Sequence, residues 1–382
     1  MTAERERRRT EEPWRVGVLF SCSGPLALIE QTQLKGTLLA IDEINEAGGI
    51  DGREVVPVIY DPGSDDASFA AHAQRLMLDD QVSCIFGCYA SSSRKAVLPV
   101  VERLDGLLWY PTLYEGFENS ANVVYTGAAP NQNSLALCDY LLGRHGQRFF
   151  FVGSDYVYPR ESNRVMRAFI ETGGGEVVGE AYVPLNATRH DFVPIVRQLR
   201  QAAPDIVFST VVGQATTFFY QCFAEAGLDS ATMPIASLTT SETEVRAMGH
   251  DVARGHLTAA SYFQGVAGSS NSDFLARFRK RFGDREPANM CAEAAYFQMH
   301  LFSRALAAAG TMESDVLRTC LADLELEAPQ GPVRMASGSG HARLWTRIGR
   351  VDDAGEFEII AEAGGPTPAD PYLVSHGRNP TA

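Results

Sequence analysis

The fold is decided by Val82–Pro111, which reads "VSCIFGCYASSSRKAVLPVVERLDGLLWYP". Its first part, Val82–Tyr89, is a short apolar run typical of a buried strand, and Gly106–Pro111 is a second run of this kind. Between them, Ala96–Asp105 has the apolar spacing of a helix. A strand, a helix and a second strand in this order predict a right-handed crossover between two parallel strands.

The same alternation continues on both sides of this segment. Further strands are predicted at Trp14–Phe20, Glu54–Asp61, Arg148–Tyr156, Glu176–Leu185, Asp205–Thr210 and Met233–Thr240. Helices are predicted at Leu26–Ala47, Ala67–Asp80, Asn133–Gly146, Arg160–Gly173, Phe192–Arg200, Ala215–Ala226, Ala292–Ala309 and Val316–Leu321. Such a pattern indicates the doubly wound α/β class, with a β-hairpin appendage expected near the C-terminus. The 382 residues suffice for two lobes, and because no Gly/Ser-rich linker separates them, the chain is expected to pass between the lobes more than once.

Composition narrows the class of function. The net charge of −14 disfavours direct binding to nucleic acid. The seven cysteines are scattered, with neither a CxxC pair nor a Cys/His cluster at zinc spacing, and are interpreted as reduced core thiols. No metal or cofactor is therefore expected.

The N-terminal stretch "MTAERERRRTEEPWRVGVLF" contains a basic run but no apolar segment long enough for an export signal. No run in the chain approaches about 18 apolar residues, so no membrane-spanning segment is expected. These two observations predict a cytoplasmic protein.

Hydroxyl side chains gather where the predicted strands end. In a doubly wound fold, ligands bind beyond the carboxyl ends of the strands. The residues at these ends are mostly Ser, Thr and Tyr, and they occupy Ser21–Gly24, Asp61–Gly63, Tyr89–Ser92, Tyr110–Thr112, Ser154–Tyr156, Thr210–Gly213 and Ser237–Thr240. Because hydroxyls both donate and accept hydrogen bonds, the set favours a small neutral polar ligand such as a primary amide.

Other interpretations of the same segment fit less well. A serine nucleophile would need a GxSxG turn and a histidine base, whereas the local sequence is "GCYASSS" and no histidine lies at an obvious strand end. A phosphate loop would need glycines, and the segment contains only Gly87. The sequence therefore predicts a protein that is not an enzyme. At least one of Ser91–Ser93 is expected to cap the following helix, and Arg94 and Lys95 are expected to face solvent.

Several runs resemble a known family. They are "GCYASSSRKAVLPVVERLDGLLWYPTLYEGFENS", "NVVYTGAAPNQNS", "GSDYVYPRESNRVMR", "IVFSTVVG", "PIASLTTSE" and "AEAAY", in this order between Val16 and Tyr372. Together they resemble the amide-sensing negative regulators of aliphatic amidase operons, within the type I periplasmic-binding-protein superfamily, and more distantly the urea and short-chain-amide substrate-binding proteins of transporters.

The resemblance implies a two-lobed fold with the ligand in the cleft between the lobes. The first lobe would comprise residues 14–127 and 257–330, and the second residues 128–256 and 331–382. The implied ligand-binding residues are Tyr89, Ser91, Tyr110, Pro111, Thr112, Tyr156, Tyr158 and Val212. Ser91 and the Tyr89 backbone would hydrogen-bond the amide, and Val212 would limit its alkyl chain. Replacement of a proline-bearing sequence by "TLY" leaves the preferred amide open.

The resemblance also implies how the protein works. It would bind acetamide or another short aliphatic amide, sequester an RNA-binding antiterminator protein, and release that partner when the amide binds. The helix at Ala292–Ala309 and the C-terminal hairpin are candidate contacts of a homodimer. The alternative is the substrate-binding component of an ABC transporter for urea, short-chain amides or amino acids, in which Glu242 would either pair with an amino acid's ammonium group or lie at a helix N-terminus.

Overall fold

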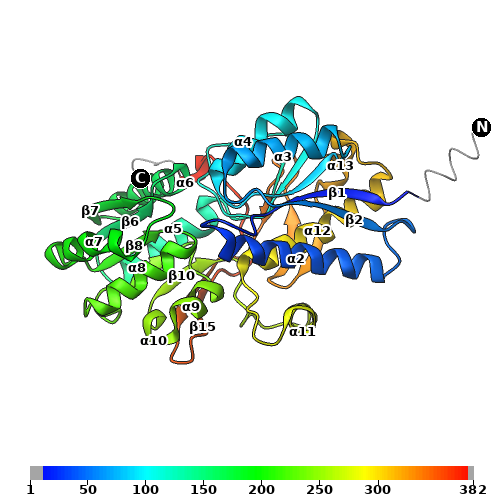
Figure 1. The fold of residues 1–382 in the computed structure, drawn as a ribbon. Coiled ribbons are helices and arrows are strands. Elements are labelled where there is room, and N and C mark those ends of the chain that lie inside the picture. Colours follow the sequence, from blue (N-terminus) through cyan, green and yellow to red (C-terminus); the bar gives the residue numbers. More distant parts are fainter. Residues whose placement is uncertain (1–11, 377–382) are drawn as a thin grey trace, which may run out of the picture.

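Five short parallel strands form the sheet of the first lobe in the computed structural model, which describes residues 12–376 (Figure 1). Their order in the sheet is β2 (Val55–Tyr60), β1 (Trp14–Leu19), β3 (Cys84–Gly87), β4 (Leu107–Tyr110) and β5 (Val123–Tyr125). Successive side chains alternate between two cores, as Cys84 and Phe86 face one and Ile85 faces the other. Helices therefore cover both faces of this sheet, which is why its strands are apolar throughout.

Two pairs of helices cover this sheet. Helix α2 (Ala27–Glu46) packs against α12 (Met290–Ala309) on one face, and α3 (Asp66–Leu78) packs against α4 (Ser91–Arg103) on the other. Helix α13 (Ser314–Leu321) lies against α12. Most of α12 is buried, so this helix belongs to the core of the first lobe.

The sheet of the second lobe has seven strands. Their order is β15 (Phe357–Glu362), β14 (Arg347–Val351), β10 (Leu257–Ala260), β9 (Ile235–Ser237), β8 (Ile206–Thr210), β6 (Arg148–Ser154) and β7 (Glu176–Val183). The strands from β10 to β7 run parallel, whereas β14 is antiparallel to both β10 and β15. The helices around this sheet are α5 (Pro130–Arg144), α6 (Val157–Thr172), α7 (Arg189–Ala202), α8 (Gln214–Glu225), α9 (Glu242–Met248) and α10 (His250–Ala253).

The C-terminal part differs in one respect from the sequence prediction. The hairpin of β14 and β15 is present, but it extends the large sheet through β10 instead of forming a separate appendage. A small antiparallel sheet precedes it, with strands β11 (Glu325–Ala328), β12 (Gly331–Met335) and β13 (Ala342–Arg343). Helix α11 (Ser269–Phe282) lies against α2, and a short 3₁₀ helix, η1 (Val374–His376), ends the described chain.

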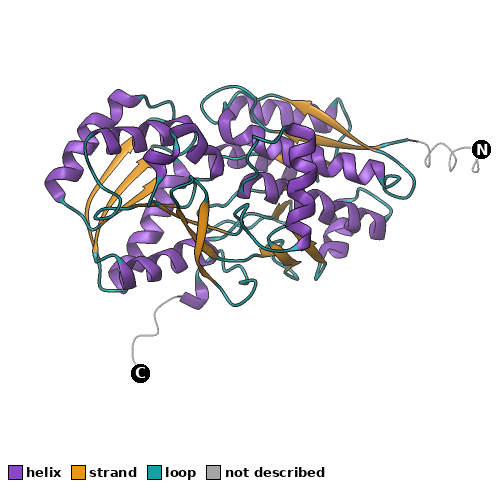
Figure 2. Cartoon of the chain, turned by 90° about the horizontal axis from the view of Figure 1, so that it is seen from below, coloured by secondary structure: helices purple, strands orange, loops and turns teal. Residues whose placement is uncertain are grey.

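The chain passes between the lobes three times, after β5, after β10 and after β13. The doubly wound, two-lobed α/β fold predicted from the sequence is thereby confirmed (Figure 2). The lobe boundaries stay a prediction, but three strands pair across them. Strand β10 pairs within the second lobe, and β12 and β13 belong to the same small sheet as β11. Residues 1–11 and the last six residues assigned to the second lobe, 377–382, lie outside the described residues.

The described cysteines are all unpaired with one another. Five are buried, whereas Cys22 is exposed and Cys320 is partly buried. The interpretation as core thiols therefore holds for five of the seven. None of the helices described here is long and apolar enough to cross a bilayer.

Candidate ligand-binding site

A small cavity lies between the lobes at the carboxyl ends of the strands. Among residues 12–376, six line it: Tyr89, Thr112 and Leu113 from the first lobe, and Tyr156, Tyr158 and Thr239 from the second. Five of these six side chains carry a hydroxyl, and none carries a charge. The volume of about 10 Å³ corresponds to roughly one water molecule. We call this space the head cavity.

Burial keeps the tyrosines of the head cavity protonated. It raises the pKa of Tyr89, Tyr156 and Tyr158 above the ordinary value for a phenol. At neutral pH each phenol therefore keeps its proton and can donate as well as accept a hydrogen bond.

Backbone and side-chain contacts hold the first-lobe wall in place. The Tyr110 hydroxyl donates to the Tyr89 carbonyl oxygen at 2.9 Å, and the Thr112 hydroxyl donates to the Cys88 carbonyl oxygen at 3.2 Å. Thr112 also accepts a hydrogen bond of 2.8 Å from the Gln33 amide on α2. Tyr110 therefore lies behind the cavity and orients the backbone of Tyr89.

Ser91 is also turned away from the head cavity. Its hydroxyl donates to the Glu115 carboxylate and accepts a hydrogen bond of 3.2 Å from Arg94. Helix α4 begins at Ser91 with Ala90 as its N-cap, and no side chain caps it. The expected serine cap is therefore wrong, because these serines occupy the first turn, where the Ser93 hydroxyl donates back to the Ala90 carbonyl oxygen.

Arg94 is buried, contrary to the expectation of a solvent-facing residue. Its side chain is 0% exposed and contacts the carboxylates of Glu115 at 3.0 Å and Glu118 at 2.7 Å. The guanidinium also lies over the rings of Tyr110 and Tyr114. Lys95 is 42% exposed and pairs with Glu118 at 2.6 Å. Of the two basic residues expected to face solvent, only Lys95 therefore does so.

The remaining predicted residues lie around the cavity rather than in it. Val212 is buried and its N–H donates to the Ser154 hydroxyl at 3.3 Å, but it does not line the head cavity. Pro111 lines a second cavity of about 20 Å³ that shares Leu113 with the first. Of the predicted residues, the structure thus brings together Tyr89, Thr112, Tyr156 and Tyr158.

Two residues of the head cavity lie outside the site predicted from the resemblance. Thr239 belongs to the hydroxyl-rich strand end after β9, so the sequence carried a signal for it. Leu113 lies in the "TLY" departure from the family, which marked the position as a place where the site could differ but did not identify this leucine as a lining residue.

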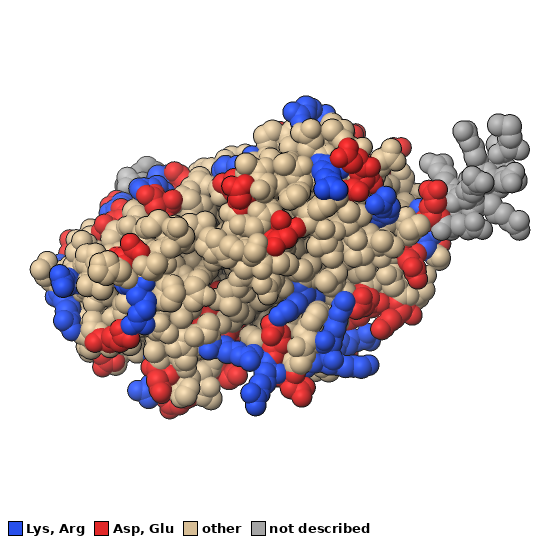
Figure 3. All heavy atoms as spheres, viewed as in Figure 1, with Lys and Arg blue, Asp and Glu red and all other residues tan. Residues whose placement is uncertain are grey.

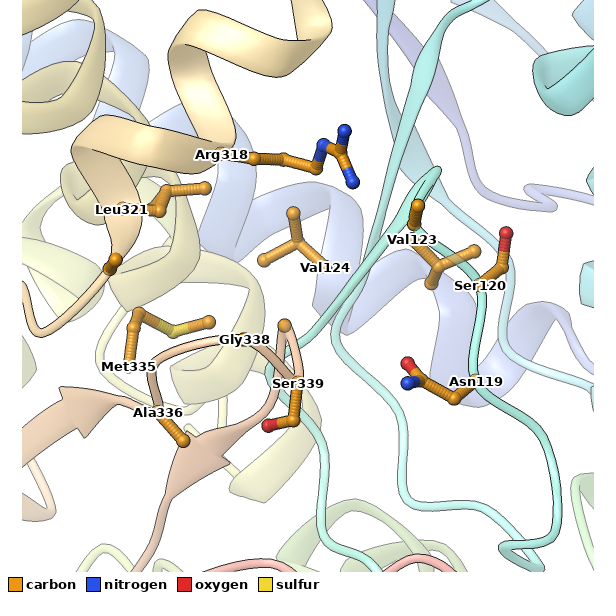
Figure 4. Close-up of a pocket in the computed structure, with 13 residues that line it drawn as sticks. Asn119, Ser120, Val123, Val124, Arg318, Leu321, Met335, Ala336, Gly338 and Ser339 are labelled. Carbon is orange, nitrogen blue, oxygen red and sulfur yellow. The ribbon is translucent and has the colours of Figure 1, made fainter.

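Larger hollows lie elsewhere. One of about 180 Å³ lies between α13, the edge strand β5 and residues 336–340, with Arg318 above an apolar floor (Figure 4). Another, of about 520 Å³, is lined by both acidic and basic side chains near α9 and the end of α11, where Lys and Arg gather on the face shown in Figure 3. Neither contains any of the eight ligand-binding residues implied by the resemblance, although Glu242 lines the second. Within residues 12–376, no group of three or more His, Cys, Asp or Glu side chains could hold a metal ion.

Comparison with known proteins identifies the class. Residues 14–378 match the family described as "Periplasmic binding protein domain", and the chain belongs to this family. It is 27% identical over 352 residues to Leu/Ile/Val-binding protein homolog 6 of Brucella abortus (strain 2308), covering 89% of this chain and 88% of the relative. It is 23% identical over 314 residues to the leucine-, isoleucine-, valine-, threonine- and alanine-binding protein of Pseudomonas aeruginosa, covering 81% and 82%.

Solved structures share the fold. A solute-binding protein of an ABC transporter from Rhodopseudomonas palustris HaA2, in complex with p-hydroxybenzoic acid, matches with a TM-score of 0.85 and 22% identity, covering 95% of this chain and all of that one. A branched-chain amino acid transporter substrate-binding protein from Streptococcus pneumoniae, in complex with isoleucine, matches with a TM-score of 0.80 and 18% identity, covering 92% and 100%.

These findings correct part of the functional prediction. The expected cytoplasmic location is wrong, because the family is that of periplasmic binding proteins and the solved relatives are transporter components. The relatives named here are binding proteins, in agreement with a protein that is not an enzyme. They support neither a regulatory role in an amidase operon nor an antiterminator partner.

Proposed function

We propose that the protein is the solute-binding component of an ABC transporter and that its solute is a small neutral polar molecule of the short-chain amide or urea class. The observation that carries this proposal is the uncharged, hydroxyl-lined cavity between the two lobes. Family membership supports the transport role.

The chemistry of the lining favours a neutral amide over a charged solute. A primary amide has two N–H donors and one carbonyl acceptor, and hydroxyls can satisfy both. An amino acid would bring a charged ammonium group, and burying an unpaired charge is costly. Glu242, the carboxylate considered for that role, lines the larger charged hollow and accepts a hydrogen bond from the Gln264 N–H at 2.8 Å. It is the first residue of α9, which fits the helix-terminal alternative.

Thermal unfolding with a panel of solutes tests the proposal. A ligand that binds only the native state stabilises it by RT ln(1 + [L]/Kd), which amounts to about 2.7 kcal/mol at 100 times Kd. We expect acetamide, propionamide or urea to raise the melting temperature, and isoleucine and benzoate to have no effect. Stabilisation by isoleucine or benzoate alone would contradict the neutral-solute assignment.

A pair of tyrosine variants localises the binding. Tyr158→Phe removes a hydroxyl from the cavity wall and should weaken amide binding about tenfold, corresponding to the loss of one hydrogen bond. Tyr372→Phe removes a hydroxyl from a side chain that is 49% exposed and should leave the affinity unchanged. Equal affinities of the two variants would place the solute outside the head cavity.

The resemblance to amide-sensing regulators favours the same ligand class but a different partner. Cross-linking of the native protein in its host, with and without amide, separates the two roles. Capture of a transporter permease is expected. Capture of an RNA-binding protein that is released by amide would contradict the transport role.

A further inference from the structure

Leu113 separates two cavities in the cleft. It is the residue that lines both the head cavity and the second cavity, here called the tail cavity, among the residues described. We propose that Leu113 sets the maximum length of the solute, and that the tail cavity is a subsite that receives the solute's apolar end once this side chain is shortened. The inference rests on the proposed function, since it concerns the solute of the same site.

The linings of the two cavities differ in chemistry. The head cavity is lined mainly by hydroxyls. The tail cavity has a mostly apolar lining that includes Pro111, Leu238 and Met290, with Thr126, Asn133 and Ser261 as its polar members. A polar group is thus stabilised on one side of Leu113, and an alkyl group would gain from burial on the other.

Neighbouring residues divide between the cavities in the same way in both lobes. In the first lobe Thr112 lines only the head cavity, and Leu113, the next residue, reaches the tail cavity as well. In the second lobe Thr239 lines only the head cavity, and Leu238 lines only the tail cavity. Leu113 is therefore the one side chain of the head cavity that also walls the tail cavity, among the residues described.

The backbone beneath this wall is held in place. The Tyr114 N–H donates to the Ala128 carbonyl oxygen at 3.1 Å. Gly127 approaches so closely that a Cβ atom on it would lie 2.0 Å from the Thr112 carbonyl oxygen. Because the main chain is fixed on both sides of Leu113, access to the tail cavity depends on the size of the side chain. Val212, to which the resemblance assigned the role of limiting the alkyl chain, lines neither cavity.

The test measures dissociation constants by calorimetry for straight-chain amides from acetamide to hexanamide. The wild-type protein should prefer the short amides. Leu113→Ala should move the optimum to longer chains and raise the affinity for hexanamide relative to acetamide at least tenfold, since one methylene in an apolar pocket is worth about 10- to 200-fold. Leu137→Ala is the matched control, because this leucine of α5 is also buried but lines neither cavity, so its loss should leave the preference unchanged.

Further variants keep the test decisive. Leu113→Val makes a smaller change and should shift the optimum in the same direction if the alanine variant does not fold. Ala259→Leu fills the tail cavity and should restore the short-chain preference in the Leu113→Ala background. An unchanged preference in folded Leu113 variants overturns the inference. If the wild-type protein binds no amide and no urea, the proposed function fails. Binding of long amides by the Leu113→Ala variant alone would still support the proposed role of Leu113 in limiting solute length. If neither the wild-type protein nor the variant binds an amide, both the proposed function and this inference are overturned.

Discussion

Replacing Arg94 by methionine should be among the most destabilising single changes in the first lobe. The side chain is 0% exposed, and it pairs with Glu115, which is 4% exposed, and with Glu118, which is 12% exposed. Arg94→Met leaves both carboxylates next to an apolar side chain, and breaking a buried ion pair by removing one partner costs about 3–5 kcal/mol. With a urea m-value of about 3 kcal/mol/M, the unfolding midpoint should fall by about 1–2 M.

Lys95→Met provides the matched control. Lys95 contacts the same carboxylates, at 2.6 Å for Glu118 and 3.9 Å for Glu115, but it is 42% exposed. An exposed pair contributes about 0–1 kcal/mol, so its midpoint should move by no more than about 0.3 M. Urea titration followed by far-UV circular dichroism measures both variants. If Arg94→Met shifts the midpoint no further than Lys95→Met, the argument from burial is refuted.

Three further changes test the packing and the buried charges. Gly36→Ala should destabilise the protein by several kcal/mol in urea titrations, because a Cβ atom there would lie 2.0 Å from the Ala292 carbonyl oxygen on α12. Gly143→Ala, in helix α5 with no atom within 4 Å of the new Cβ, should instead stabilise it by up to about 1 kcal/mol, and a loss of stability there would contradict the helix propensity argument. Glu293→Gln tests a pH dependence: burial raises the pKa of Glu293 to about 8, so the folded state holds a proton that the unfolded state releases above its pKa of 4.5. The free energy of unfolding of the wild-type protein should therefore fall by up to about 1.4 kcal/mol per pH unit as the pH rises from about 4.5 to 8. Urea titrations across this range should show a weaker dependence of this free energy on pH for the variant. Equal pH dependence of the two proteins would refute the raised pKa of Glu293.

The parts of the fold that could be predicted from sequence are those with a repeated local signal. The longer strands and their covering helices follow from apolar runs and helical spacing, as in β6 and α6. Strands β5 and β10 do not follow from this reasoning, because they have only three and four residues and neither lies within a longer apolar run. The antiparallel addition of β14 to β10 is a long-range pairing, which no local pattern records.

In the candidate site, the positions of the lining residues could be predicted from the sequence, but the directions in which their side chains point could not. That cavity-lining residues follow the strand ends was predictable, and Tyr89, Thr112, Tyr156 and Tyr158 do line the head cavity. Whether each hydroxyl points into the cleft depends on which partners lie behind it. Ser91 turns back because Glu115, which is distant in sequence, offers it a buried carboxylate, and that partner carries no pattern that would reveal it.

The buried charges behind Ser91 bear on why the cleft suits a neutral solute. Arg94 and Lys95 supply two positive charges, and Glu115 and Glu118 supply two negative ones, all within one connected set of contacts. Because these charges cancel locally, the set offers the head cavity no unpaired partner for an ion. A charged solute would lose its hydration without gaining a counter-charge, whereas an amide would lose only hydrogen bonds that the surrounding hydroxyls can replace. The proposed selectivity for uncharged solutes would then depend on the pairing of Arg94 as much as on the hydroxyls, so Arg94→Met should weaken discrimination against cationic solutes as well as stability.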